Sequence, residues 1–403
     1  MKKSKKNILV ISLFSNVFNV QWSCLSIVHD RYNFEFILLF KDRKIENFLN
    51  EKNIKFYIVD YKKFDLYVKY LPFIRIVLKE IYYFLSYKSL RKKIGKKQNF
   101  LFINDNSLTI GKYFLKEFQE NGKASFMYDY GLSLFNVRFI EKIAKTADKG
   151  FVKNFINKIE KNIKYYLIDK PYFKLKSPGY HPHDFGISHL LVINDISRQN
   201  ALKIYNSFND VVNIGNIQTL KYRNQKVENH NYVLIILSNG YEVAEHYGLD
   251  KNSYFYNLRK VLSYLKKEKM DVVLKHHPND KMKKYNFLKK EFSNYEWIKH
   301  NEKSNKDLIS KAKIIISPMS TLAMEAIFIK KPILFFNYFN EKKETFEFFN
   351  EIFLDLPLLD LTKTFNVNQL KTQLSNISSE GYDKYINTVS FKKNFINFLE
   401  SLD

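Results

Sequence analysis

The sequence predicts an α/β protein with two doubly wound domains, and three observations support this fold class. The chain has 403 residues, about twice the length of an ordinary single domain. Short apolar runs alternate with longer amphipathic stretches, which is the rhythm of strands and helices in a parallel sheet. A polar segment at 221–231 interrupts this rhythm once, after which it begins again. We therefore expect domains at 1–225 and 226–403 that face each other across a cleft.

The first domain is predicted to contain strands separated by helices. The basic start of the chain and the apolar run after it imitate a signal peptide, but the run ends at Ser15 without a cleavage site. We interpret this run as the first buried strand. The stretch 71–87 is interrupted by Arg75, Lys79 and Glu80, which makes it an amphipathic helix and not a membrane span. The predicted strands are 7–14, 34–40, 55–60, 100–104, 124–128, 190–194 and 211–214, with helices at 45–52 and 111–121 and a helical insertion at 140–176.

The second domain repeats the pattern. Between its first two strands lies a helix at 254–267, in which Leu258, Val261, Leu262 and Leu265 recur at helical spacing. The predicted strands are 232–237, 271–275, 296–298, 314–317 and 332–336. In open sheets of this kind, ligands bind outside the carboxyl ends of the strands. The polar residues that follow each strand are therefore the candidates for chemistry.

Composition and charge limit the classes of function. The single cysteine, Cys24, excludes an intrachain disulfide and a cysteine-rich zinc site, and it suits the reducing cytoplasm. The net charge of +25 fits nucleic acid, an anionic membrane surface or an acidic substrate. The lysines are scattered, and neither an RNA-binding aromatic motif nor a zinc-finger spacing accompanies them. We therefore expect no nucleic-acid binding and favour peripheral contact with anionic lipid headgroups.

A histidine pair follows the second predicted strand of the second domain. Lys275, His276, His277 and Pro278 come directly after the apolar run. An imidazole at this position can donate a hydrogen bond to a phosphate oxygen and neutralise charge on a leaving group. Pro278 restricts the preceding residue to an extended backbone and turns the chain out of the sheet. An ordinary surface loop and a metal-binding pair are the alternatives. Because no cysteine or carboxylate stands at metal-ligand spacing, we expect no metal.

A hydroxyl-bearing turn joins the strand at 314–317 to a helix of good helix formers. The turn and the helix start contain Ser317, Ser320 and Thr321. The unpaired N–H groups of a helix start, with hydroxyls beside them, form an anion site that needs no metal. Glu325 lies four residues after Thr321 and so on the same helix face, where it can hydrogen-bond a ribose. Taken alone, this motif favours the simpler interpretation that Ser320 or Thr321 caps the helix.

Further candidates follow other predicted strands. Asp129 ends the strand at 124–128, and Gly131 permits a sharp turn after it. A carboxylate there can take a proton from an acceptor hydroxyl, and Asp105 occupies an equivalent strand end. The loop after the first strand of the second domain is either a ligand-facing loop or a plain turn. It contains Ser238, Asn239 and Gly240, followed by the acidic residues Glu242 and Glu245.

Taken together, three motifs resemble those of the bacterial sialyltransferases and polysialyltransferases of the GT-B fold. Those families carry an acidic motif that ends in glycine, then a His-Pro motif, then a paired serine motif. The matching stretches are Asp129-Tyr130-Gly131, His277-Pro278 and Ser320-Thr321. Tyr130 replaces the second acidic residue and Thr321 the second serine, which leaves the exact family open. The resemblance covers motifs between residues 125 and 335 and is not a continuous alignment.

The resemblance implies an inverting, metal-independent transfer of a nonulosonic acid from a CMP-sugar to a hydroxyl of a cell-surface glycan, such as a lipooligosaccharide or a capsule. It implies that Asp129 is the general base and that His277 meets the departing CMP phosphate, which Ser320 and Thr321 also hold. A glutamate binds the ribose in those families, and the two candidates here are Glu296 and Glu325. Some lipooligosaccharide sialyltransferases take their acidic group from the second-domain loop, which keeps Glu242 and Glu245 open as alternatives.

The resemblance also implies that no cofactor is needed beyond the donor. From the single cysteine and the net charge we expect a cytoplasmic protein, peripheral on the inner face of the membrane. A different GT-B enzyme of the envelope, such as a CMP-Kdo transferase or a CDP-glycerol glycerophosphotransferase, is the nearest alternative. A noncatalytic, basic nucleic-acid-binding protein is the alternative from another class.

Overall fold

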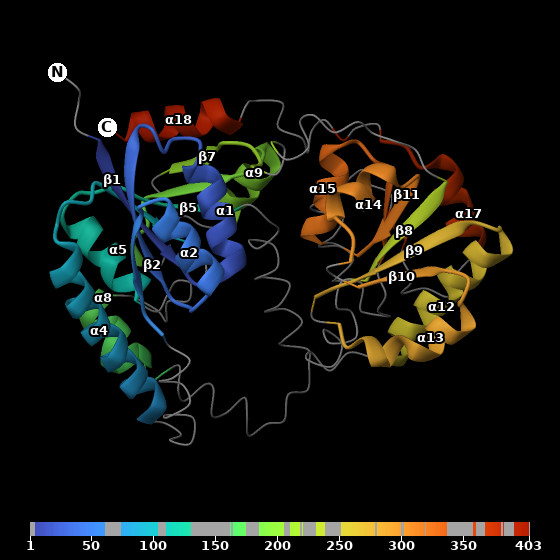
Figure 1. The fold of residues 1–403 in the computed structure, drawn as a ribbon, viewed down its shortest axis with the longest axis horizontal. Helices are drawn as coiled ribbons and strands as arrows, with labels where there is room; N and C mark the ends of the chain where they lie inside the picture. Colours follow the sequence, from blue (N-terminus) through green and yellow to red (C-terminus); the bar gives the residue numbers. More distant parts are fainter. Residues whose placement is uncertain are drawn as a thin grey trace. The chain divides into compact units, whose positions relative to one another are not determined.

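The computed structural model divides into two units, each built around a parallel sheet (Figure 1). The first unit holds the described residues up to Ile217 together with the last helix, and the second unit holds the described residues between them. The structure describes residues 5–60, 74–103, 110–129, 162, 164–174, 185–204, 210–217, 220, 231–237, 251–278, 280–299, 302–318, 320–336, 358–359, 367–379, 382 and 391–402. The boundary predicted near residue 225 lies outside these residues.

The described strands of the first unit form one parallel sheet in the order β3-β2-β1-β4-β5-β6-β7. The predicted strands of this domain are all confirmed with nearly the same bounds. They are β1 (Lys6–Ser12), β2 (Tyr32–Leu38), β3 (Lys55–Ile58), β4 (Phe100–Ile103), β5 (Ser125–Asp129), β6 (His189–Val192) and β7 (Asp210–Asn213). The apolar run that imitates a signal peptide is β1, and its residues Ile8 to Ile11 are fully buried. Burial on both faces explains why the central strands β1 and β4 are nearly continuous apolar runs.

The helices of the first unit pack on this sheet through aromatic side chains. Trp22 and Phe18 of α1 contact Phe36 of β2, with ring centroids 6.5 and 5.3 Å apart. Asp42 begins α2, because its carboxylate accepts from the N–H groups of the first turn. The helices are α1 (Ser15–Leu25), α2 (Arg43–Glu51), α4 (Ile74–Ile94), α5 (Gly111–Glu120), α8 (Lys170–Phe173), α9 (Asp195–Ile204) and α18 (Phe391–Ser401), with a π-helix, η1, at Tyr165–Asp169.

The last helix, α18, belongs to the first unit, whereas the sequence predicts it in the second domain. Phe398 lies 5.4 Å from Phe126 of β5 and 5.5 Å from His189 of β6, measured between ring centroids. Arg31 and Glu400 form an ion pair at 2.7 Å at the end of the same helix. An amphipathic helix must cover its apolar face, and this face is covered by the first sheet.

A buried ion cluster joins α4, α5 and η1. The fully buried ammonium of Lys112 lies 2.6 Å from a carboxylate oxygen of Glu80 and 3.4 Å from one of Asp169. The Tyr113 hydroxyl donates at 3.0 Å to Oε2 of Glu80, the same oxygen that Lys112 contacts. Burial lowers the pKa of Lys112 and raises the pKa of Asp169, and their mutual attraction opposes both shifts. The stretch predicted as an amphipathic helix is thus α4, which turns its one acidic residue inward. None of the helices in the described part of the chain has the length and apolar character needed to cross a bilayer.

The described strands of the second unit form a second parallel sheet in the order β10-β9-β8-β11-β12-β13. Every predicted strand is confirmed, and one short strand, β13, was not predicted because two residues leave no periodic signal. The strands are β8 (Tyr232–Leu237), β9 (Asp271–His276), β10 (Glu296–Ile298), β11 (Ile314–Ser317), β12 (Ile333–Phe336) and β13 (Leu358–Leu359). The helices are α12 (Lys251–Lys267), α13 (Asn286–Glu291), α14 (Asn305–Lys311), α15 (Thr321–Phe328) and α17 (Val367–Asn376), with a 3₁₀ helix, η3, at Met282–Tyr285.

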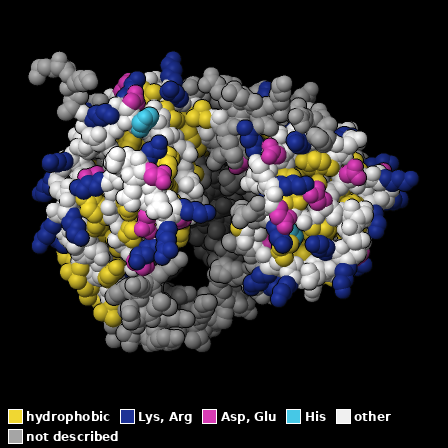
Figure 2. Space-filling view, in the orientation of Figure 1, with side chains coloured by type: hydrophobic (Ala, Val, Ile, Leu, Met, Phe, Trp, Pro, Cys, Tyr) yellow, Lys and Arg dark blue, Asp and Glu magenta, His cyan; other side chains and the backbone are white. Residues whose placement is uncertain are grey.

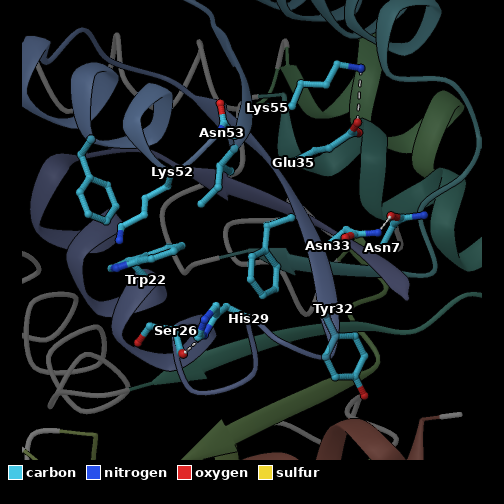
Figure 3. Close-up of a pocket in the computed structure, with 13 residues that line it drawn as sticks. Asn7, Trp22, Ser26, His29, Tyr32, Asn33, Glu35, Lys52, Asn53 and Lys55 are labelled. Atoms are coloured by element: carbon cyan, nitrogen blue, oxygen red, sulfur yellow. Dashed lines mark hydrogen bonds and ion pairs between the residues drawn. The ribbon is translucent and has the colours of Figure 1, made fainter. Parts of the chain in front are cut away.

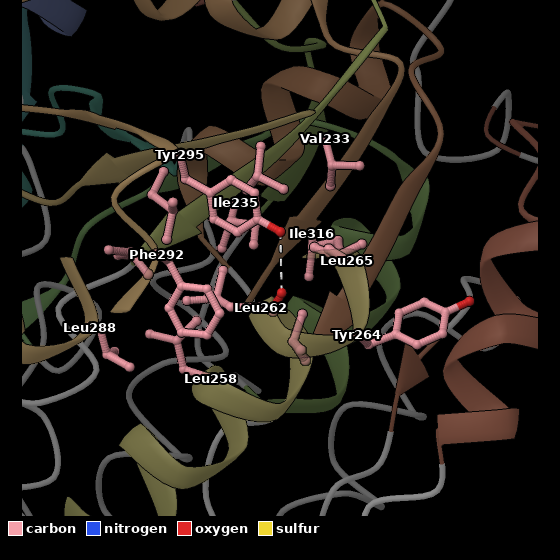
Figure 4. Close-up of a cluster of buried hydrophobic side chains, with 14 of the residues drawn as sticks. Val233, Ile235, Leu258, Leu262, Tyr264, Leu265, Leu288, Phe292, Tyr295 and Ile316 are labelled. Carbon is pink, nitrogen blue, oxygen red and sulfur yellow. Dashed lines mark hydrogen bonds between the residues drawn. The ribbon is translucent and has the colours of Figure 1, made fainter. Parts of the chain in front are cut away.

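The core of the second unit lies between α12 and the sheet (Figure 4). Leu258, Leu262 and Leu265 are fully buried against strand residues such as Ile235, as their helical spacing predicts. The Tyr295 hydroxyl donates to the Leu262 carbonyl at 3.2 Å and so keeps its polar atom satisfied within this core. The strand order reverses between β8 and β11, and in doubly wound sheets a crevice opens at the carboxyl ends of such a strand pair.

Candidate functional site

A cavity of about 220 Å³ lies at the carboxyl ends of β8 and β9, beside the start of α15. This is the point at which the strand order of the second sheet reverses. Residues from separate predicted motifs line the same cavity. They are Lys275, His276, His277 and Pro278 from the histidine motif and Ser320 and Glu325 from the hydroxyl motif, together with Ile236, Leu237, Asn305 and Leu322, which the sequence pattern did not single out.

The two histidines at the end of β9 have different environments. His276 is the last residue of the strand and is buried. Its ring meets Tyr285 edge-on with centroids 4.9 Å apart, and it lies 5.8 Å from the Trp297 ring. His277 follows the strand and is only partly buried. The first imidazole is therefore held by aromatic packing, and the second is the more accessible to a ligand.

Asp280 fixes the loop that carries His277, although no sequence pattern marked it. Its Oδ2 atom accepts from the His277 backbone N–H at 2.8 Å and lies 3.5 Å from His276 Nδ1. The Tyr285 hydroxyl donates to Oδ1 at 3.4 Å and lies 3.0 Å from the Tyr254 hydroxyl. The carboxylate is fully buried. A signal was present in the sequence, because an acidic residue three positions after His277 can accept from the backbone N–H of that residue.

Lys275 brings a buried ammonium to the cavity. Burial lowers the pKa of Lys275, and the negative charge of Glu302 opposes this shift. A cation in a site that excludes water interacts more strongly with an anionic ligand than a surface lysine does. In the part of the chain that the structure describes, no group of three or more His, Cys, Asp or Glu side chains can hold a metal ion.

The start of α15 combines a helix cap with a place in the cavity. Ser320 has an extended backbone, and its Oγ accepts from the Ala323 N–H at 3.1 Å, so it is the N-cap. The Ser320 Oγ also lies 3.4 Å from the Ser317 Oγ, and a ligand in the cavity would compete with this long contact for the Ser320 hydrogen. Ser317 is fully buried and donates to the Pro318 carbonyl at 2.7 Å, so it supports the turn and does not line the cavity. Thr321 begins the helix, but its side chain is not described.

The structure separates the two glutamates that were proposed to bind a ribose. Glu325 lies in α15, is buried and lines the cavity. Glu296 is the exposed first residue of β10 and pairs with Lys303. The register places Glu296 beside Val273, in the middle of β9 and before the carboxyl end where the cavity lies. Glu325 is thus the only one of the two positioned to contact a ligand there.

Asp129 is the last residue of β5 and lies at the carboxyl edge of the first sheet. It is buried, and its register partner is Val192 of β6. It belongs to the first unit and the cavity to the second. The remaining predicted candidates lie outside the described residues. They are Asp105, Tyr130, Gly131, Ser238, Asn239, Gly240, Glu242 and Glu245.

Comparison with known proteins identifies the fold. No protein-family model matches the sequence, and no curated protein matches it. Solved structures do match over nearly the whole chain, and they are GT-B glycosyltransferases and epimerases. The chain therefore has the GT-B fold, with two Rossmann-like units.

Three structures show the extent of the likeness. A UDP-glucosyltransferase from Polygonum tinctorium capable of glucosylating indoxyl is 12% identical, with a TM-score of 0.54 and coverage of 100% of this chain and 95% of that one. The UDP-GlcNAc 2-epimerase from Methanocaldococcus jannaschii is 10% identical, with a TM-score of 0.55 and coverage of 98% and 99%. MurG from Acinetobacter baumannii is 11% identical, with a TM-score of 0.51 and coverage of 98% and 99%. At such identities the likeness is one of fold.

Proposed function

We propose that this chain is an inverting, metal-independent glycosyltransferase that moves a nonulosonic acid from a CMP-sugar to a hydroxyl of a cell-surface glycan. The observation that carries the proposal is the meeting of His277, Ser320 and Glu325 in one cavity at the strand ends. The coarser part, a glycosyltransferase, is supported by the fold shared with a UDP-glucosyltransferase and with MurG. The choice of CMP and of a nonulosonic acid rests on the three motifs.

The cavity is suited to a departing phosphate. When the bond between the anomeric carbon and the phosphate oxygen breaks, its electron pair goes to the phosphate, which gains negative charge. The first N–H groups of α15 and the Ser320 hydroxyl can bind that charge, and Lys275 supplies a cation. His277 donates a further hydrogen bond, and Glu325 accepts from the ribose hydroxyls. A hydrogen-bond donor that binds the negative charge developing on the phosphate in the transition state lowers the activation barrier by about 3 kcal/mol.

Asp129 is the base of the proposed reaction. Its carboxylate takes the proton of the acceptor hydroxyl as that oxygen attacks the anomeric carbon from the side opposite to CMP, which inverts the configuration. Asp129→Ala is therefore expected to reduce transfer as strongly as loss of a general base does, by about 10²–10⁴-fold. If the variant keeps the normal turnover, the base is another acidic group, and Glu242, Glu245 and Asp105 are tested next.

A scan of CMP-, CDP- and UDP-sugars for a shift in melting temperature tests the donor. A ligand that binds the folded state stabilises it, by about 2.7 kcal/mol at one hundred times its Kd. A CMP-nonulosonate is expected to give the largest shift. A larger shift with CMP-Kdo or CDP-glycerol favours the corresponding envelope transferase. A shift with UDP-GlcNAc alone, accompanied by formation of its epimer without an acceptor, replaces the proposal with an epimerase.

The proposed enzyme works in the cytoplasm, at the inner face of the membrane, and α4 is the surface that supports this. Ile81 and Leu85 lie one turn apart on α4 and are 49% and 60% exposed. The last turn of α4 carries Lys92 and Lys93, and its one acidic residue is the buried Glu80. Figure 2 shows exposed apolar side chains on the part of the first unit where α4 lies. Apolar side chains flanked by lysines suit an anionic bilayer surface.

Cosedimentation with vesicles tests this contact. Binding to vesicles of phosphatidylglycerol and phosphatidylcholine is expected to exceed binding to phosphatidylcholine alone, and Leu85→Glu is expected to abolish the difference. Leu202→Glu is the matched control, because Leu202 is 48% exposed on α9 of the same unit. Equal binding of both variants contradicts a role for α4. Among the described residues on the face shown in Figure 2, lysines and arginines are scattered and form no continuous stripe, which argues against a nucleic-acid track.

A further inference from the structure

A second cavity lies in the first unit, at the sheet edge opposite to Asp129 (Figure 3). It is a groove of about 710 Å³, within the usual range of small-molecule sites of about 300–1,000 Å³. Its residues include Asn7 of β1, Asn33 and Glu35 of β2 and Lys55 of β3, all near the amino ends of parallel strands. The proposed transfer takes place at carboxyl ends, so this groove is a separate site.

One wall of the groove is aromatic. Trp22 meets Phe48 edge-on at 5.1 Å and Phe34 edge-on at 6.5 Å, measured between ring centroids. The two phenylalanines hold the indole in place, and the indole is half-buried and lines the groove. A rigid, partly exposed aromatic face offers an electron-rich surface to polarised C–H groups. The faces of a sugar ring consist of such C–H groups.

The groove also contains polar groups with unused hydrogen-bonding capacity. His29 Nδ1 lies 2.8 Å from the Ser26 carbonyl, which can only accept, so the neutral ring carries its hydrogen there and leaves Nε2 as an acceptor. Asn33 donates through Nδ2 to Asn7 at 3.1 Å and keeps its carbonyl oxygen for a ligand. Asn53 is exposed at the rim. Planar amides and an imidazole at fixed positions can pair with the hydroxyl groups of a saccharide.

Among the described residues, the unpaired charge in the groove is positive. Glu35 is already engaged, by Lys55 at 3.4 Å and by the side-chain amide of Gln98 at 2.8 Å. Lys52 lines the groove and is exposed, and its ammonium forms no hydrogen bond or ion pair with a described residue. In Figure 3 the Lys52 side chain extends toward the Trp22 ring. The group with unused charge is thus a cation in the same groove as the aromatic wall.

We infer that this groove binds an acidic saccharide. One sugar ring packs on Trp22, its hydroxyls pair with His29, Asn33 and Asn53, and its carboxylate meets Lys52. The binding does not depend on the transfer reaction, so the inference goes beyond the proposed function. A transferase that acts on a glycan gains from such a site, because a second contact raises the effective concentration of the chain at the protein.

Fluorescence locates the binding. The chain has two tryptophans, Trp22 in this groove and Trp297 in the second unit. In the full-length Trp297→Phe protein, all tryptophan emission comes from Trp22. Sialyllactose is expected to change the intensity or wavelength of this emission in a saturable manner. If saturating sialyllactose leaves the emission unchanged, the inference is overturned.

Calorimetric titration assigns the groups. Lys52→Ala is expected to weaken sialyllactose binding about threefold to fivefold, which is the upper end of the effect that an exposed ion pair has on affinity. Binding of lactose, which has no carboxylate, is expected to stay unchanged. Trp22→Ala is expected to weaken both sugars about tenfold or more, as loss of an aromatic anchor does. Lys44→Ala is the control for Lys52→Ala, because Lys44 lies in α2 and Lys52 follows the end of that helix. Tyr256→Ala is the control for Trp22→Ala, because it removes an exposed aromatic ring from the second unit.

Two outcomes contradict the assignment even if all variants fold. One is equal affinity of wild type, Lys52→Ala and Lys44→Ala for sialyllactose. The other is binding of polyglutamate with the affinity of sialyllactose, which means that the groove recognises charge alone and accepts an acidic peptide. Because these measurements read binding and not release of CMP, their failure leaves the proposed transferase untouched, and failure of the transferase leaves this site untouched.

Discussion

Removing the Asp280 carboxylate is expected to destabilise the second unit and, at the same time, to free the loop that carries His277 in the candidate site. Asp280 accepts from the His277 N–H at 2.8 Å and from the Tyr285 hydroxyl at 3.4 Å, and it is fully buried. A hydrogen bond to a charged group contributes about 1.5–3 kcal/mol, and the longer bond adds a fraction of that. Asp280→Ala is therefore expected to lower the free energy of unfolding by about 2–4 kcal/mol.

The two tryptophans make this loss measurable in the unit concerned. In a Trp22→Phe background, Trp297 alone reports, and its ring lies 5.8 Å from His276. For a unit of this size, about 1 kcal/mol changes the melting temperature by about 2–4 °C, so a fall of about 4–16 °C is expected. Affinity for the donor is expected to fall as well, because the loop of His277 loses its anchor.

Two variants separate the carboxylate from other effects. Asp280→Asn keeps the shape and one acceptor oxygen, so it is expected to lose only about 1 kcal/mol. Asp271→Ala removes an exposed aspartate from the start of the same strand and is expected to melt like the wild type. If Asp280→Ala has the same melting temperature as Asp271→Ala and binds the donor with normal affinity, the carboxylate does not hold the loop, and the reasoning is refuted.

Three further predictions concern single side chains. Ser320→Ala is expected to lose about 1 kcal/mol of stability and to weaken donor binding, whereas Ser320→Asp keeps the cap and still loses binding, because it places a negative charge at the phosphate site. If both Ser320 variants bind the donor with the affinity of the wild type, Ser320 has no role in binding the phosphate. Burial lowers the pKa of His189, so the unfolded state binds its proton first. As the pH is lowered past about 6.5, the melting temperature reported by Trp22 is therefore expected to decrease, and this decrease is expected to be smaller in His189→Leu. Lys112→Ala removes the buried ammonium that pairs with Glu80 and Asp169, which leaves Glu80 without a cation in the described part of the chain and Asp169 with Lys164 at 3.5 Å. It is expected to destabilise the first unit by about 3–5 kcal/mol in urea unfolding, against less than 1 kcal/mol for the partly exposed Lys116→Ala.

Much of the fold is predictable because parallel strands that are buried on both faces leave continuous apolar runs. The strand Asp271–His276 is an example, and its end could be located from the histidines that follow. The strand Leu358–Leu359 is too short to leave such a run. The apolar face of the last helix shows that something must cover it, but the periodicity does not reveal which sheet does so.

The candidate site is predictable to the extent that strand ends meet at one edge of a sheet. His277 and Ser320 were placed there by this rule, and they line the same cavity. The same rule disfavours Glu296, because it is the first residue of its predicted strand, and the register beside Val273 agrees. Asp280 acts through a backbone N–H three residues before it, and this spacing occurs in many turns, so it does not by itself point to a functional site.

Release of CMP from CMP-N-acetylneuraminic acid, measured with and without a galactose-terminated glycan, tests the central proposal most directly. The wild type is expected to release CMP faster when the acceptor is present and to form the sialylated product. His277→Ala is expected to lose about 10²–10³-fold in rate, the scale of one donor to developing charge, while Trp297 emission shows that the second unit stays folded. Turnover of His277→Ala at the rate of the wild type, or no release of CMP that depends on the acceptor, would contradict the account.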